Sequence, residues 1–285
     1  MFYISAFIIH QYLGVDNAEA FMSNVNLQAQ NPSASLVMQA LTASFGSFFL
    51  PAFMFSVLAY GNFCQAMKLK SLPPSYLMLL SLLLIFLSGV FASLLVDINK
   101  SLPLPDSLQF LKEYQKKYEL LLDSLFSGIT IQRLLALVLV LAVLPALGEE
   151  IFFRGVVQKI LSESRLGPHG AIFFTSVAFS AMHFEFENSL AIFFMGLMLG
   201  YIFYFTQSLW ASIAAHFMNN FIQIIFKYLF VSGYIADDYS DPSGVSLYQT
   251  APAGVLSIFV FWLLYKKRVI TENSQSTNSI IHHEA

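Results

Sequence analysis

Six polar or charged residues stand in or beside stretches of this sequence that are otherwise almost wholly apolar. They fall into three groups along the chain: Glu149, Glu150 and Arg154 in "EEIFFR", His183 at the end of "FSAMH", and His216 and Asn220 in "HFMNN". An ionisable group inside a membrane segment costs about 2.5 kcal/mol or more even on lenient scales, so each one suggests a function. Because such groups must pair with one another or with water, we expect the three groups to converge.

The two adjacent glutamates have different expected surroundings. On a helix, Glu150 and Arg154 are at positions i and i+4, so their side chains meet on one face and can form a buried ion pair. Glu149 is rotated by about 100° from Glu150 and is left without that arginine. Two neighbouring carboxylates in different environments can take separate acid and base roles. We therefore predict a structural role for Glu150 and a chemical role for Glu149.

The histidines and the asparagine can complete a hydrolytic site. His216 and Asn220 are again four residues apart, so the amide can orient a ring, bind a water or donate to a developing oxyanion. Phe179 precedes His183 by four residues and can hold its imidazole. Glu149, His183 and His216 could bind Zn²⁺ with an open fourth position, or Glu149 could activate a water directly as a general base. The sequence has no His-Glu-x-x-His motif, and each histidine taken singly could be a hydrogen bond between helices.

The composition predicts that membrane-spanning helices carry these residues. The chain of 285 residues is 57% hydrophobic and only 11% charged, whereas a soluble domain has about 25% charged residues. Most of its surface should therefore meet lipid. A net charge of −3 and scattered basic residues argue against nucleic-acid binding. The single cysteine, Cys64, excludes an internal disulfide and any metal site with two or four cysteines.

Seven apolar runs are expected to cross the membrane, for which about 20 residues are typical. They are residues 36–60, 75–96, 134–160, 170–183, 189–206, 208–231 and 250–265. Residues 97–131 are polar, and their middle part has apolar residues at helical spacing among charges, which is typical of an amphipathic helix on a membrane face. We predict an all-α, polytopic transmembrane helical bundle of about seven to eight helices with one amphipathic interfacial helix.

One membrane domain in four parts is expected. These parts are 1–130 with N-terminal transmembrane helices and the amphipathic section, 131–232 with the three polar groups, 233–270 with an extramembrane loop and the last transmembrane helix, and 271–285 as a disordered tail. The first residues have no basic region and no small-residue cleavage site, so a cleaved signal peptide is not expected. Lysine and arginine in short loops place the C-terminus in the cytoplasm. Gly196 and Gly200 have the spacing that lets helices approach closely.

The ordered set of three groups, about 34 residues apart, resembles the motifs of a known family. Glu-Glu-x-x-x-Arg, Phe-x-x-x-His and His-x-x-x-Asn are the motifs of the CPBP family, which comprises type II CAAX prenyl endopeptidases and bacteriocin-processing or bacteriocin-immunity proteins, among them those like lysostaphin resistance protein A. The resemblance covers roughly residues 134–226. It implies an intramembrane endopeptidase with a membrane-associated peptide or protein substrate, and we expect it in the plasma membrane of a bacterium.

The resemblance also implies a role for each matching position. In motif order, the family's residues map to Glu149, Glu150, Arg154, His183, His216 and Asn220. The first of these would be the water-activating base or a metal ligand, and Asn220 the oxyanion partner. The family is commonly labelled metalloprotease, which would make Glu149, His183 and His216 ligands of Zn²⁺. A metal-free mechanism with glutamate and histidine suits the same residues.

Two other functions and one geometric difficulty remain open. The polar cluster could belong to a non-catalytic membrane scaffold or bacteriocin-immunity protein, or to a proton-coupled transporter, although no inverted repeat supports the latter. Glu149 lies sixteen residues past Arg133, about 24 Å along a helix, which places it near the cytoplasmic side. His183 ends its own span and is expected near the opposite side. Convergence therefore requires that span to be short or strongly tilted, with "FEFEN" turning in a wet cavity.

Overall fold

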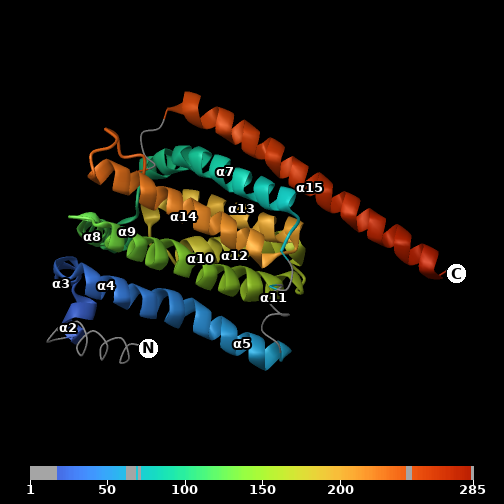
Figure 1. Cartoon of the computed structure of the whole chain (residues 1–285), viewed down its shortest axis with the longest axis horizontal. Helices are drawn as coiled ribbons and strands as arrows, with labels where there is room; N and C mark the ends of the chain where they lie inside the picture. Colours follow the sequence, from blue (N-terminus) through green and yellow to red (C-terminus); the bar gives the residue numbers. More distant parts are fainter. Residues whose placement is uncertain (1–17, 62–68, 70–71, 242–245, 284–285) are drawn as a thin grey trace.

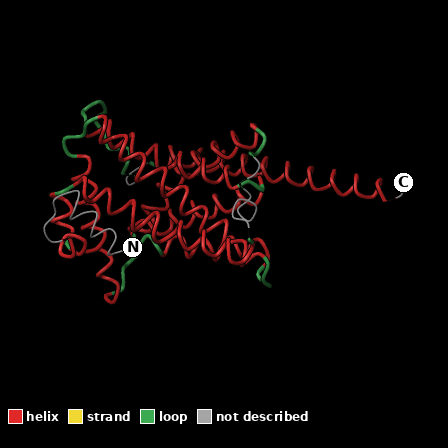
Figure 2. The backbone as a smooth tube through the Cα atoms, turned by 60° about the horizontal axis from the view of Figure 1, so that its bottom comes forward, coloured by secondary structure: helices red, strands yellow, loops and turns green. Residues whose placement is uncertain are grey.

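The computed structural model is a bundle of helices, and the described residues contain no strand (Figures 1 and 2). It describes residues 18–61, 69, 72–241 and 246–283. The predictions for Cys64 and for the first residues of the chain lie outside these. The all-helical fold class is confirmed.

Six helices in the described part of the chain are long and apolar enough to cross a membrane. They are Pro32–Ala59, Ser75–Ser101, Ile131–Ser162, Phe186–Thr206, Leu209–Val231 and Leu247–Arg268. Each of these six helices corresponds to one of the seven expected runs. The remaining run, 170–183, forms α12 (Gly167–Ala181), which has only 15 residues. At 1.5 Å per residue α12 is about 22 Å long, short of a hydrocarbon core of about 30 Å. The expected count of seven to eight is therefore not confirmed.

The helices pack around two that occupy the middle of the bundle. Figure 1 shows α13 (Ser189–Thr206) and α14 (Leu209–Val231) there, with α7 (Ser75–Ser101) and α15 (Leu247–His283) on one side. The other side carries the first span, built from α4 (Pro32–Gln39), η1 (Ala40–Phe49) and α5 (Leu50–Tyr60), which the short helices α2 (Ala18–Ser23) and α3 (Val25–Gln30) precede. Between these layers runs the long helix of residues 131–162.

The long helix is continuous but contains two π-helical segments. Its segments are α9 (Ile131–Leu137), η3 (Val138–Val143), α10 (Leu144–Glu150), η4 (Ile151–Gln158) and α11 (Lys159–Ser162). Both η3 and η4 are π-helical, and such wide turns inside α-helices are frequent at functional sites. The glutamate pair closes the α-helical segment between them.

The predicted amphipathic helix is α8 (Gln109–Phe126), which follows a single turn, η2 (Asp106–Leu108). Its lysines and its acidic residues are exposed, whereas Leu121, Leu125 and Phe126 are buried. These three pack in one apolar cluster with Leu134, Leu137 and Ile224, among others. Burying this stripe against the long helix and α14 holds α8 across one end of the bundle.

The short α12 removes the depth difficulty. Glu149 lies thirteen residues before Ser162, and Ala181 lies fourteen residues after Gly167. Counted from the loop that joins these helices, the two positions are both about 20 Å deep. The predicted separation of His183 from Glu149 was wrong because α12 is not a full span, which would carry His183 to the far side.

The last helix continues where the sequence predicts a disordered tail. α15 runs to His283, and Figure 1 shows its C-terminal half projecting beyond the bundle. Residues 269–283 contain neither glycine nor proline, so no residue in this stretch interrupts the helix.

Candidate active site

Glu150 is the centre of a buried polar network. Its side chain has no exposed surface, and its Oε1 accepts hydrogen bonds from Nη1 of Arg154 at 2.7 Å and from Nδ1 of His216 at 2.9 Å. Its Oε2 accepts a short hydrogen bond from the hydroxyl of Ser212. Both carboxylate oxygens are therefore occupied by partners from its own helix and from α14. The predicted pairing of Glu150 with Arg154 is present.

Arg154 joins this network to α13. Its guanidinium is fully buried, donates through Nη2 to the carbonyl of Gly196 at 2.9 Å and lies 4.8 Å from the ring centre of Phe179. One turn further, Nε2 of Gln158 donates to the carbonyl of Gly200 at 3.2 Å. The two glycines lie where α13 meets α12: a Cβ would come within 3.2 Å of Ser176 at Gly196 and within 2.9 Å of Ile172 at Gly200, which is the close approach that their spacing predicts.

His216 lies between the two glutamates. Because the ionised Glu150 can only accept, the Nδ1 atom of His216 carries the proton in that bond, and Nε2 is left on the other side of the ring. Nε2 lies 3.9 Å from Oε2 of Glu149. This oxygen is buried and has no hydrogen-bond partner. The Glu149 carboxylate is therefore free of the network that holds its neighbour, although its side chain is only 12% exposed.

Phe179 brings His183 to the same cluster. The Nδ1 atom of His183 is 2.8 Å from the carbonyl oxygen of Phe179, and the two rings are in contact, tilted at 55° with centroids 4.7 Å apart. The Phe179 ring also lies edge-on to His216, with centroids 5.9 Å apart. One aromatic ring thus contacts Arg154, His183 and His216. The hydrogen bond to the Phe179 carbonyl leaves Nε2 of His183 as the nitrogen that can meet a substrate.

Asn220 lies one turn beyond His216 on α14 and faces the long helix. Its Nδ2 donates to the carbonyl of Leu141 at 3.3 Å. This bond joins α14 to the π-helical segment η3 of the long helix. Asn219 in turn donates to Oδ1 of Asn220 at 3.2 Å.

α8 adds a residue that the sequence reasoning missed. Burial, reinforced by the nearby charges of Glu185 and Glu149, raises the pKa of Tyr118 well above its ordinary value. The phenol therefore stays protonated near these two carboxylates. Helical spacing alone gives no signal for Tyr118, because both glutamates come from other parts of the chain.

Ser212 was also missed, although a signal for it exists. It precedes His216 by four residues, as His216 precedes Asn220, so all three share one face of α14. Extending the pattern by one turn would have found the hydroxyl that Glu150 uses.

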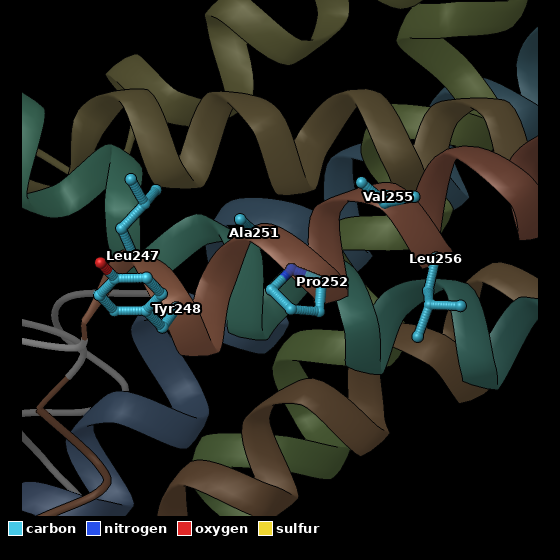
Figure 3. Close-up of a pocket in the computed structure, with 6 residues that line it drawn as sticks. All are labelled: Leu247, Tyr248, Ala251, Pro252, Val255 and Leu256. Atoms are coloured by element: carbon cyan, nitrogen blue, oxygen red, sulfur yellow. The ribbon is translucent and has the colours of Figure 1, made fainter.

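The three residues proposed as metal ligands are not arranged as a metal site. In the described part of the chain, no group of three or more histidine, cysteine, aspartate or glutamate side chains could hold a metal ion. Figure 3 shows a surface hollow elsewhere, lined mostly by apolar residues of α15 from Leu247 to Leu256. Among the residues that line it, Tyr248 alone carries a polar side-chain group.

The comparisons with known proteins bear on the same segment. Residues 131–222 match the family model described as type II CAAX prenyl endopeptidase Rce1-like. This stretch contains all three polar groups. No curated protein and no solved structure matches the chain.

Proposed function

Since residues 131–222 belong to the Rce1-like family of type II CAAX prenyl endopeptidases, we propose that the chain hydrolyses a peptide bond in or next to the membrane. Its six apolar helices make it an integral membrane protein. In this proposal Glu149 activates water, and His183, His216 and Asn220 complete the site. The substrate is a membrane-associated peptide or protein.

The observation that carries the proposal is the unpaired oxygen of Glu149. Oε2 is buried without a partner and faces Nε2 of His216 across 3.9 Å. In the proposed mechanism a water binds between these two atoms, about 2.8 Å from each, and donates one hydrogen to each of them. Leaving a buried carboxylate oxygen unpaired costs about 1–3 kcal/mol or more, so a water there is favoured.

The proposed reaction splits that water. Glu149 takes one proton as the water oxygen attacks the scissile carbonyl carbon, and the second hydrogen stays on the bond to His216. Asn220 has one amide N–H beyond the one that Leu141 uses, and this N–H can stabilise the oxyanion. Glu149 then returns its proton to the leaving amine nitrogen. The hydroxyl remains on the new carboxyl group, so atoms and charges balance.

The neighbouring network of Glu150 and Arg154 holds His216 in the orientation that the reaction needs. Glu150 holds the Nδ1–H of His216, which directs Nε2 towards the water. Arg154 offsets the charge of Glu150 within the buried cluster. These two residues act through His216 and contact neither water nor substrate in the proposal.

The test is cleavage by the purified protein in lipid nanodiscs. Two probes are offered: a farnesylated peptide with a C-terminal CAAX sequence, and a pool of unmodified single-span peptides with varied flanking residues, with products read by mass spectrometry. We expect the wild type and Glu163→Gln, an exposed control, to cut at least one probe, and Glu149→Gln and His183→Ala to cut neither. If both of these variants cut as well as the wild type, the proposed mechanism is lost.

The outcome with the two probes also defines the substrate class. Cleavage of the farnesylated peptide alone would assign this chain the activity in the family's name. Cleavage of the unmodified pool alone would assign it a prenyl-independent activity. Cleavage of neither probe by the wild type would favour a non-catalytic scaffold or immunity protein.

A further inference from the structure

The turn between α12 and α13 begins at Met182, includes His183 and contains a strained residue. Phe184 has φ of 55°, in the left-handed region that residues with a side chain rarely adopt. Such a conformation costs about 1–3 kcal/mol and persists only where the surroundings fix it. The amides of His183 and Phe184 donate to the carbonyls of Ser180 and Ala181 at 3.2 and 3.3 Å. The place of His183 therefore depends on what fixes this turn.

A buried asparagine from another helix holds the far end of the turn. Asn99, near the end of α7, donates through Nδ2 to the carbonyl of Phe186 at 2.6 Å. Its Oδ1 accepts from the hydroxyl of Ser189 at 2.9 Å and from the amide of Leu190 at 3.1 Å. Only 1% of Asn99 is exposed, so water does not compete for these bonds. One side chain thus fixes both η5 (Phe186–Asn188) and the first turn of α13.

A second bond makes this end rigid with respect to α12. The hydroxyl of Ser180 donates to the carbonyl of Ser189 at 2.7 Å. Residues 180–189 are therefore closed into a loop whose base is Ser180 and Ser189, and Asn99 fastens that base to α7. His183 and the strained Phe184 lie inside this loop.

We propose that Asn99 is a positioning residue for His183. It lies outside the three motifs and outside residues 131–222, and it touches no reacting atom. This inference rests on the proposed function, because the proposed function is what gives His183 a part in hydrolysis. Without the three bonds of Asn99, Phe184 can leave the left-handed region, and His183 then shifts away from the Phe179 carbonyl.

Two substitutions separate the contributions of Asn99. Asn99→Ala removes all three bonds. Asn99→Asp keeps an oxygen that accepts from Ser189 and Leu190 but no longer donates to Phe186. The matched control is Ser81→Ala, which removes a buried hydroxyl of α7 whose only recorded bond is to the carbonyl of Leu77 in the same helix. We expect the displacement of His183 to increase from the wild type through Asn99→Asp to Asn99→Ala. In the control Ser81→Ala, His183 should stay where it is in the wild type.

The first readout is turnover by the full chain in nanodiscs, at saturating concentrations of whichever probe peptide the wild type cleaves. Misplacing a catalytic group by about 1 Å can lower the rate about 100-fold. We expect kcat to fall by about 10- to 100-fold in Asn99→Ala and less in Asn99→Asp, with KM nearly unchanged. An unchanged kcat in a folded Asn99→Ala protein would overturn the proposal.

The second readout needs no activity. Histidine-labelled protein gives ring NMR signals from six histidines, and the signal that disappears in His183→Gln identifies His183. We expect Asn99→Ala to move this signal and to leave that of His216, which Glu150 holds. If Asn99→Ala does not fold, the same comparison is made with Asn99→Asp. A His183 signal that stays in place in the Asn99 variants contradicts the positioning role. If the signal moves in these variants but the wild type cleaves no peptide, only the proposed function is contradicted.

Discussion

Replacing each of the adjacent glutamates by glutamine should separate their roles. Glu150→Gln should destabilise the fold, whereas Glu149→Gln should leave the fold stable and abolish peptide cleavage. In Glu150→Gln the amide keeps its shape, but the fully buried Arg154 loses the charge that compensates it. Removing one partner of a buried ion pair costs about 3–5 kcal/mol. Since Ser212 can turn its hydroxyl and accept from the new amide, the lost charge accounts for most of this change.

In Glu149→Gln the folded state should change little. Oε2 of Glu149 has no hydrogen-bond partner in the protein, so the substitution removes no hydrogen bond from that oxygen. We expect the free energy of unfolding to change by less than about 1 kcal/mol. Peptide cleavage should nevertheless disappear, because an amide cannot take a proton from water at neutral pH.

The measurement is equilibrium unfolding of both variants in mixed detergent micelles, followed by circular dichroism, together with peptide cleavage. Arg154→Met combined with Glu150→Gln serves as the control, since the double variant leaves no unpaired charge and should be more stable than Glu150→Gln alone. Equal losses of stability in the two single variants would refute the division between a structural and a chemical glutamate.

Three further predictions concern packing, metal and pH. Gly200→Ala should destabilise the fold by about 1–3 kcal/mol, because its Cβ would lie 2.9 Å from Cγ2 of Ile172, while Gly89→Ala, where the nearest atom is 3.5 Å away, should be nearly neutral in the same micelle titration. Treatment with a chelator should leave peptide cleavage unchanged, and a loss that Zn²⁺ restores would refute the metal-free mechanism. Burial opposes the ionisation of Asp238, but hydrogen bonds, including one from Lys227, outweigh it and hold the pKa of Asp238 below its ordinary value. Its stabilising effect should be fully present above about pH 5 and be lost as pH falls below about 4, so the stability difference between wild type and Asp238→Asn should shrink across that range, and a difference independent of pH would contradict this.

The membrane helices and the convergence of the polar groups could be predicted from the sequence, because both follow from the cost of placing polar groups in lipid. Long apolar runs must span lipid, and charged groups within them must find partners. The i, i+4 relation then gave the contact between Glu150 and Arg154 directly. Six of the seven expected runs correspond to helices of spanning length.

Other features depend on contacts between distant parts of the chain. The spacing of "FSAMH" does not show that α12 stops after 15 residues, because its apolar pattern gives no end signal short of His183. Asn99 reads as a polar residue near the end of a span, and its role depends on a turn 87 residues later. The sequence reasoning paired Glu150 with Arg154 and did not anticipate His216 as a further partner, since two helices had to meet before that bond could form.

The polar face of α14 also has a consequence for how the helices slide past one another during folding. Helices in lipid pack without a hydrophobic force between them, so apolar contact alone tolerates many axial offsets. Ser212 and His216 bond to Glu150, and Asn220 bonds to Leu141. A shift of α14 by one residue would move each donor by about 1.5 Å and turn it by about 100°, which would break all three bonds together. A nearly correct axial alignment therefore forms none of these three hydrogen bonds, so one alignment of the two helices is distinctly preferred.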